Sequence, residues 1–185
     1  MRTSDLDAWL PDAQIVSRHR RTSTAEPADL WRAAREIRLS DTRTLGRLIR
    51  WRIPGTPADL RFSELFSRYP FAVLDEGRDW SVSGLCGPIW TQARDYAVID
   101  GDAFRAWDRP GTVRVLFGHW VEEAEPRSAL VSEARVEPTD RFARLQLRAL
   151  WLFVRRFERV IGAEPLPLAV ERAERVRRAP RRAAR

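Results

Sequence analysis

The chain has 185 residues, of which 44% are hydrophobic and 32% charged, so it fits one domain with a sizeable core. Cys86 is the single cysteine, which excludes an intrachain disulfide, a zinc site made of cysteines and a redox pair. The formal net charge is +7, but residues 171–185 hold seven Arg and two Glu, a net of +5 that leaves +2 for residues 1–170. We therefore expect a solvated basic tail, with weak contact to an anionic surface as the alternative, and no specific binding of nucleic acid.

The sequence favours a cytoplasmic location. The longest strongly apolar run, 149–154, is bracketed by Arg148 and Arg155 and is far shorter than the roughly 20 residues of a transmembrane helix. The first residues, "MRTSDLDAWLPDA", lack the continuous apolar stretch of a secretion signal. A reducing compartment also agrees with the single cysteine.

The first third of the chain predicts one strand followed by two short helices. Residues 13–24 alternate in character and contain β-branched residues, which is typical of a strand. Residues 25–37 place apolar side chains on one helical face, with Pro27 in the first turn, where proline is tolerated. A second helix is expected over 42–51, and "IPGTP" ends it because proline and glycine break the pattern.

From residue 60 onward, short aromatic segments separated by turn residues predict a sheet. The expected strands are 71–77, 79–85, 95–100, 103–108, 112–123 and 128–137. The last two alternate over a long span and are joined by "AEPR", which favours an antiparallel hairpin.

A long helix is expected near the C-terminus, with Thr139 as its N-cap and Asp140 in its first turn. It should run to about Ile161, a length of roughly 33 Å. Apolar residues occupy much of its circumference, namely Phe142, Leu145, Ala149, Leu150, Trp151, Phe153 and Phe157. The segment "GAEPLP" should end this helix, and a shorter helix is expected from Leu168.

This order of elements predicts an α+β fold in which a curved antiparallel sheet wraps around the long C-terminal helix. Residues 1–165 would form this single domain, and 166–185 an Arg-rich extension that is partly helical or disordered. Because a strongly curved sheet cannot contact a straight helix along its whole length, we expect an apolar cavity near one end. The alternative is a filled core without a pocket.

A series of segments in this chain resembles one known superfamily. In order, they are "AEPADLW" with "LSD", "GLCGPIW", "FRAWDRPG", "LVSEARVEPTDRFAR" and "LWLFV". Together they are similar to the START-like, helix-grip superfamily (SRPBCC; polyketide cyclase/dehydratase and lipid-transport type), from about Val16 to Phe157. The resemblance implies a hydrophobic pocket beneath the C-terminal helix, suited to a lipid, an isoprenoid or an aromatic polyketide. It does not decide between carriers and enzymes, because the superfamily contains both.

Several chemistries are excluded by composition. The chain has no Lys, so it has no P-loop lysine and no anchor for a Schiff base or pyridoxal phosphate. His19, His119 and Cys86 show no spacing typical of metal ligands. Cys86 also has no neighbour that would activate its thiol. We therefore predict neither a metal nor a cofactor.

His119 is the most informative single residue, because it lies on an otherwise apolar face of the strand 112–123. Such a histidine is either a hydrogen-bonded core residue or a general acid/base. Its partners depend on the register of the hairpin, for which two alternatives are open. Burial favours the register that pairs Val121 with Leu130.

In that favoured register His119 faces Ser132. The charged residues Glu133 and Arg135 then point to solvent. If the register slips by one residue, His119 faces Glu133, and Arg135 lies beside Phe117 in the cavity. The slipped register would form a catalytic cluster of His119, Glu133 and Arg135 that could hold a carboxylate or enolate oxygen.

Two functions follow from this sequence. The first is the binding of a hydrophobic small molecule, and the second is a cyclase, aromatase or dehydratase that uses pocket polar residues for proton transfer. The residues expected to contact the ligand are Trp90, Phe104, Trp107, Phe117, His119, Leu147 and Trp151. For the aromatic residues Trp90, Phe104, Trp107 and Trp151, core packing without ligand contact is the favoured alternative.

Overall fold

A computed structural model describes residues 6–91 and 95–183, without the side chains of 153, 156–162 and 177–183. The fold class is α+β, as predicted. Two residues of the expected apolar helix, Phe153 and Phe157, lie outside the described side chains.

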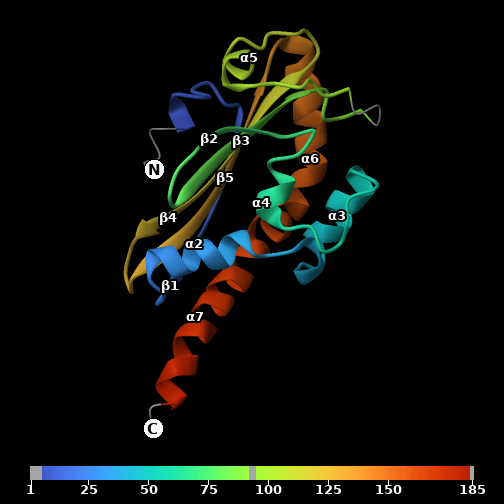
Figure 1. The fold of residues 1–185 in the computed structure, drawn as a ribbon. Coiled ribbons are helices and arrows are strands. Elements are labelled where there is room, and N and C mark those ends of the chain that lie inside the picture. Colours follow the sequence, from blue (N-terminus) through green and yellow to red (C-terminus); the bar gives the residue numbers. More distant parts are fainter. Residues whose placement is uncertain (1–5, 92–94, 184–185) are drawn as a thin grey trace.

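A five-stranded antiparallel sheet forms the centre of the molecule, in the order β1-β5-β4-β3-β2 (Figure 1). The strands are β1 (Ile15–Ser23), β2 (Ala72–Glu76), β3 (Trp80–Gly87), β4 (Val113–Glu123) and β5 (Ser128–Pro138). The predicted hairpin is present, since β4 and β5 pair along their whole length. The first strand pairs with the last, which places β1 at one edge and β2 at the other.

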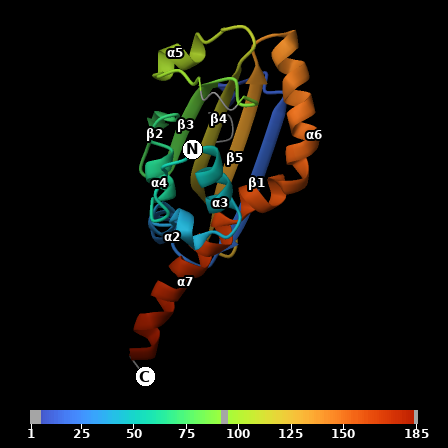
Figure 2. The ribbon, with the colours of Figure 1, turned by 90° about the vertical axis from the view of Figure 1, so that its right-hand side faces the viewer.

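Helices lie around this sheet. They are α2 (Pro27–Arg35), the 3-10 helix η1 (Leu39–Asp41), α3 (Leu45–Arg52), α4 (Phe62–Leu65), α5 (Gly101–Arg105), α6 (Arg141–Ala163) and α7 (Pro165–Ala183). Figure 2 shows α6 alongside β1, with α7 extending beyond the end of the sheet. Helices α3, α4 and α6 lie on one side of the sheet and the N-terminal segment lies on the other (Figure 1). The long helix α6 therefore shares its side of the sheet with α3 and α4.

Two of the predicted strands are wrong. Residues 95–100 have no regular structure, and the region 103–108 contains most of α5 instead. The cause is Asp100, whose carboxylate accepts a hydrogen bond of 2.8 Å from the N–H of Ala103 and so caps a helix. The apolar side chain of Phe104 then faces the core from a helical turn, which produced the misleading alternation in the sequence.

The ends of the C-terminal helices also differ from expectation. Asp140, rather than Thr139, is the N-cap of α6, and its carboxylate accepts hydrogen bonds from the N–H groups of Ala143 and Gly111. Helix α7 begins at Pro165, three residues earlier than predicted. Its first half is anchored, because Leu166, Ala169 and Ala173 are buried against α2.

The long helix α6 is apolar on two sides, and only one of them is covered. Ala143 and Leu147 are buried, and Leu150 and Trp151 are half-buried. On the outer side Phe142, Leu145 and Leu152 are exposed, as is Ala149. The apolar circumference predicted for this helix is thus partly a solvent-facing surface.

The sheet separates two cores. On one face, Leu6, Trp9 and Leu10 of the N-terminal segment pack with Phe104 and Trp120. On the other face, apolar clusters form between the strands and helices α2, α6 and α7. Side chains alternate between these faces along each strand, so the register decides which face each residue joins.

Candidate functional site: a cavity crossed by a polar row

A cavity of about 620 Å³ lies between one face of the sheet and the helices that cover it. Its walls include Trp31 and Ala34 of α2, Phe62 of α4, Trp151 and Val154 of α6, and Leu166 of α7. Its floor is the sheet, where apolar residues such as Ile15, Leu130, Ala134 and Val136 line it. The lining is therefore mainly apolar and aromatic, as in sites for small hydrophobic ligands.

One line of polar side chains crosses this apolar floor. The register pairs Glu76 with Ser81, Ser81 with His119, His119 with Ser132, and Ser132 with His19. Each of the five strands contributes one residue, and all five residues line the cavity. We call this set the polar row. Both histidines of the chain belong to it.

His119 lies in the middle of the polar row, against an aromatic wall. Its ring centroid is 4.8 Å from that of Phe66, which in turn lies 5.2 Å from the centroids of Phe71 and Phe117. Burial lowers the pKa of His119 to about 4. The imidazole is therefore uncharged at neutral pH and offers one N–H donor and one nitrogen acceptor.

The two ends of the polar row differ from its centre. At the β1 edge, the Nε2 atom of His19 lies 3.2 Å from the Oγ atom of Ser17. At the β2 edge, Glu76 is exposed, as is Arg35 of α2, which also lines the cavity. These exposed charges mark the side of the cavity that meets solvent.

The junction between α6 and α7 is fastened to α3 beside the cavity. The carboxylate of Glu164 accepts hydrogen bonds from the N–H groups of Thr44, at 3.1 Å, and Leu45, at 2.9 Å. These N–H groups belong to the start of α3 and would otherwise have no acceptor within the helix. Leu45 and Pro165, on either side of this contact, both line the cavity.

The residues predicted to contact a ligand are distributed over three places. Phe117, His119 and Trp151 line the cavity. Trp90 and Leu147 pack in the adjoining apolar cluster below α6. Phe104 and Trp107 pack on the opposite face of the sheet with the N-terminal segment, because the segment that carries them includes α5 and is not a strand.

The hairpin has the register that burial favoured. Val121 pairs with Leu130 and His119 with Ser132. Glu133 and Arg135 therefore lie on the face opposite to His119, and the three candidate catalytic residues do not form one cluster. The expectation that the two charged residues point to solvent was wrong, because they are 2% and 6% exposed. The N-terminal segment covers them.

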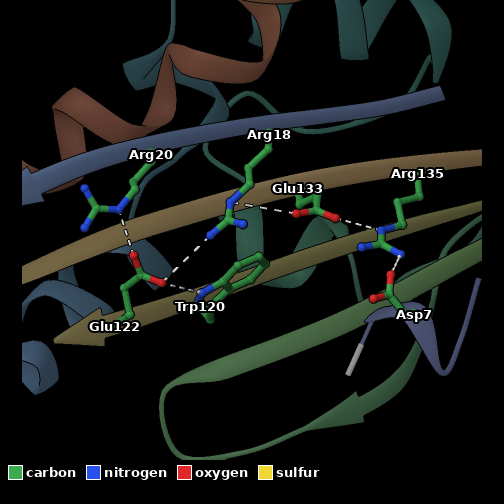
Figure 3. Close-up of polar contacts among 7 residues, drawn as sticks. All are labelled: Asp7, Arg18, Arg20, Trp120, Glu122, Glu133 and Arg135. Atoms are coloured by element: carbon green, nitrogen blue, oxygen red, sulfur yellow. Dashed lines mark hydrogen bonds and ion pairs between the residues drawn. The ribbon is translucent and has the colours of Figure 1, made fainter. Parts of the chain in front are cut away.

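On that face Glu133 and Arg135 belong to a series of ion pairs, of which these two residues are the buried members (Figure 3). The ion pairs form a chain that we call the charge ladder, which consists of Arg20, Glu122, Arg18, Glu133, Arg135 and Asp7. At its buried end, the Nε atom of Arg135 donates a 2.7 Å hydrogen bond to Glu133, and another guanidinium nitrogen donates to Asp7. Burial alone would lower the pKa of Arg135, but the hydrogen bonds to Asp7 and Glu133 outweigh it and raise the pKa. Arg135 therefore stays charged.

Two other possible sources of chemistry are the Cys86 thiol and clusters of metal-binding side chains. Burial raises the pKa of Cys86 to about 12, so its thiol stays protonated at neutral pH despite the nearby Arg114. Among the described residues, no three side chains of His, Cys, Asp or Glu gather as metal ligands would. In the same part of the chain, no helix has the length and apolar character needed to cross a membrane.

Most of the polar row was not predicted from the sequence. The expected register of the hairpin covers only its centre. It placed His119 opposite Ser132, but it did not extend the row to Ser81, Glu76 and His19. A signal was present in the alternation of β1, where His19 shares a face with Ile15 and Ser17. The pairing of β1 with β5 was the missing information.

Comparison with known proteins adds no identification. The sequence matches no model of a protein family, and a search of curated proteins gives no match either. The description of the site therefore depends on its own geometry.

Proposed function

We propose that this chain is a helix-grip protein of the START-like type that binds a hydrophobic small molecule between the sheet and its helices. The observation that carries the proposal is the cavity of about 620 Å³ with its mainly apolar lining. Ligand sites commonly have volumes of roughly 300–1,000 Å³ and a few polar groups in apolar walls. The resemblance of the sequence to lipid-transport proteins supports the same class of ligand.

The alternative, an acid/base enzyme of the cyclase or dehydratase kind, receives less support from the geometry. The proton-transfer cluster considered for it needs Glu133 or Arg135 beside His119. The sheet lies between them. We therefore propose binding without an assigned reaction.

The test uses diphenylhexatriene, a hydrocarbon dye that fluoresces in apolar surroundings. We expect the purified protein to bind it at one site per chain. Ala134→Phe should weaken dye binding at least about tenfold, because Ala134 lines the cavity floor and a phenyl ring there fills the space. Filling the cavity should not lower the thermal stability strongly, which a parallel melting curve checks.

Val16→Phe is the matched control. Val16 is also on the sheet, but its side chain is exposed and does not line the cavity. It should leave dye binding unchanged. The proposal fails if the wild-type protein binds no dye, or if both phenylalanine variants reduce binding equally.

A further inference from the structure

We propose that the molecule bound in this cavity is apolar but carries an uncharged oxygen, such as that of an alcohol, a ketone or an amide. His119 and Ser132 are its hydrogen-bonding partners. This inference rests on the proposed function and specifies the chemical class of the ligand.

The geometry of the polar row is the first reason. Neighbouring strands are about 4.8 Å apart, so Ser81, His119, Ser132 and His19 extend over roughly 14 Å of the cavity floor. Hydroxyl and imidazole groups alternate along this line, and both can donate and accept hydrogen bonds. An oxygen placed over the middle of the row therefore meets suitable partners on either side.

The second reason is that the centre of the row lacks protein partners. Within the part of the chain that the structure describes, the side chains of Ser81, His119 and Ser132 form no hydrogen bond with another residue. His119 contacts the ring of Phe66 instead. These three side chains are half-buried at the cavity, so their polar atoms can form hydrogen bonds with a ligand oxygen that replaces water there.

The third reason is the distribution of charge. Among the described side chains, the charged residues that line the cavity are Arg35, Glu64 and Glu76, of which Arg35 and Glu76 are exposed. The buried cation Arg135 and the more exposed Arg18 belong to the charge ladder on the opposite face. A carboxylate over the centre of the row would meet no buried cation among the described side chains that line the cavity, whereas an uncharged oxygen does not need one.

Three ligands of equal chain length test this selectivity, namely 1-decanol, 2-decanone and decanoate. Each is titrated at pH 7.5 against the protein loaded with diphenylhexatriene. We expect the alcohol and the ketone to displace the dye at concentrations at least tenfold lower than decanoate. Equal or tighter binding of decanoate would overturn the inference.

Substitutions test which side chains form the hydrogen bond to the alcohol. Ser132→Ala and His119→Leu should each weaken binding of 1-decanol about 3- to 10-fold, as expected for one lost hydrogen bond, and neither should weaken binding of the hydrocarbon dye, which forms no hydrogen bond. Ser63→Ala is the control, because Ser63 lines the cavity from α4 but donates its hydrogen bond to the carbonyl of Arg35. It should change neither affinity.

The outcomes separate the two proposals. If the dye does not bind, the proposed function fails and this inference fails with it. If the dye binds but the alcohol and decanoate compete equally, or Ser132→Ala has no effect on the alcohol, only the inference about the polar row fails. Should His119→Leu fail to fold, Ser132→Ala still decides the result.

Discussion

The two faces of the sheet handle polar groups in opposite ways. Ser132 and Glu133 are consecutive residues of β5, yet Ser132 faces a cavity and Glu133 is buried on the opposite face. The cavity face carries uncharged polar side chains at the centre of the polar row. The other face carries paired charges, with Arg135 held between Glu133 and Asp7.

This difference shows that the alternation of side chains along a strand can keep buried ions away from a cavity. A buried ion pair stabilises a fold only when well-oriented contacts offset the loss of hydration, and an unpaired ion in an apolar cavity costs several kcal/mol in folding free energy, on the order of 3–5. With its buried ions on the far side, the sheet leaves the centre of the cavity floor, at Ser81, His119 and Ser132, without a carboxylate or guanidinium group. The comparison can be tested by changing one face at a time.

The largest expected effect concerns the buried end of the charge ladder. Glu133→Ala leaves the guanidinium of Arg135 without its main buried partner, so the free energy of unfolding should fall by about 3–5 kcal/mol. Ser132→Ala, on the adjacent residue, should change it by less than about 1 kcal/mol. Urea denaturation of both variants measures the contrast. Equal effects would contradict the assignment of the two residues to different faces.

A second, intermediate effect comes from the cavity face and depends on pH. The pKa of His119 is about 4 in the folded protein and about 6.5 when unfolded, so the unfolded chain binds more protons between these values. Stability should therefore fall as the pH drops from 6.5 to 4, by up to about 3 kcal/mol from this residue.

His119→Gln removes the contribution of His119 to the pH dependence of stability. Ser81→Ala, on the same polar row, is the control. The difference in unfolding free energy between wild type and His119→Gln should change across this pH range. For Ser81→Ala the difference should stay constant. A constant difference for both would show that His119 is not held uncharged by burial.

The smallest effect is expected at the exposed end of the charge ladder. Arg20 donates a 2.7 Å hydrogen bond to Glu122, but their side chains are 43% and 33% exposed. Arg20→Ala should cost less than about 1 kcal/mol, and the cost should shrink in 1 M salt. A loss as large as that of Glu133→Ala would mean that the ladder acts as one unit along its whole length.

Much of the sheet could be predicted from sequence because its pattern is local. The apolar alternation around Val121 and Leu130 indicated the register that the hairpin has. Phe104 was misplaced for an equally local reason, since the helix cap by Asp100 competes with the strand pattern. The capping preference of Asp was visible in the sequence but was not weighed there.

The rest of the site depends on contacts between distant segments. Glu133 and Arg135 were expected in solvent because the favoured register turns their neighbours Leu130, Ala134 and Val136 toward the interior. The N-terminal segment covers that face of the sheet, and its Leu6, Trp9 and Leu10 are all buried. Their spacing is helical and gave a usable signal, but the face against which they pack could not be derived from it. The polar row likewise required the pairing of β1 with β5.

Glu164 has a mechanical consequence for the cavity. Its carboxylate joins the α6–α7 junction to the first N–H groups of α3. If the junction moved outward, those amides would lose their acceptor, at a cost of about 1–3 kcal/mol. The α6–α7 junction and α3 are therefore expected to shift together. A bulky ligand that widens the cavity beside Glu164 would have to displace both segments.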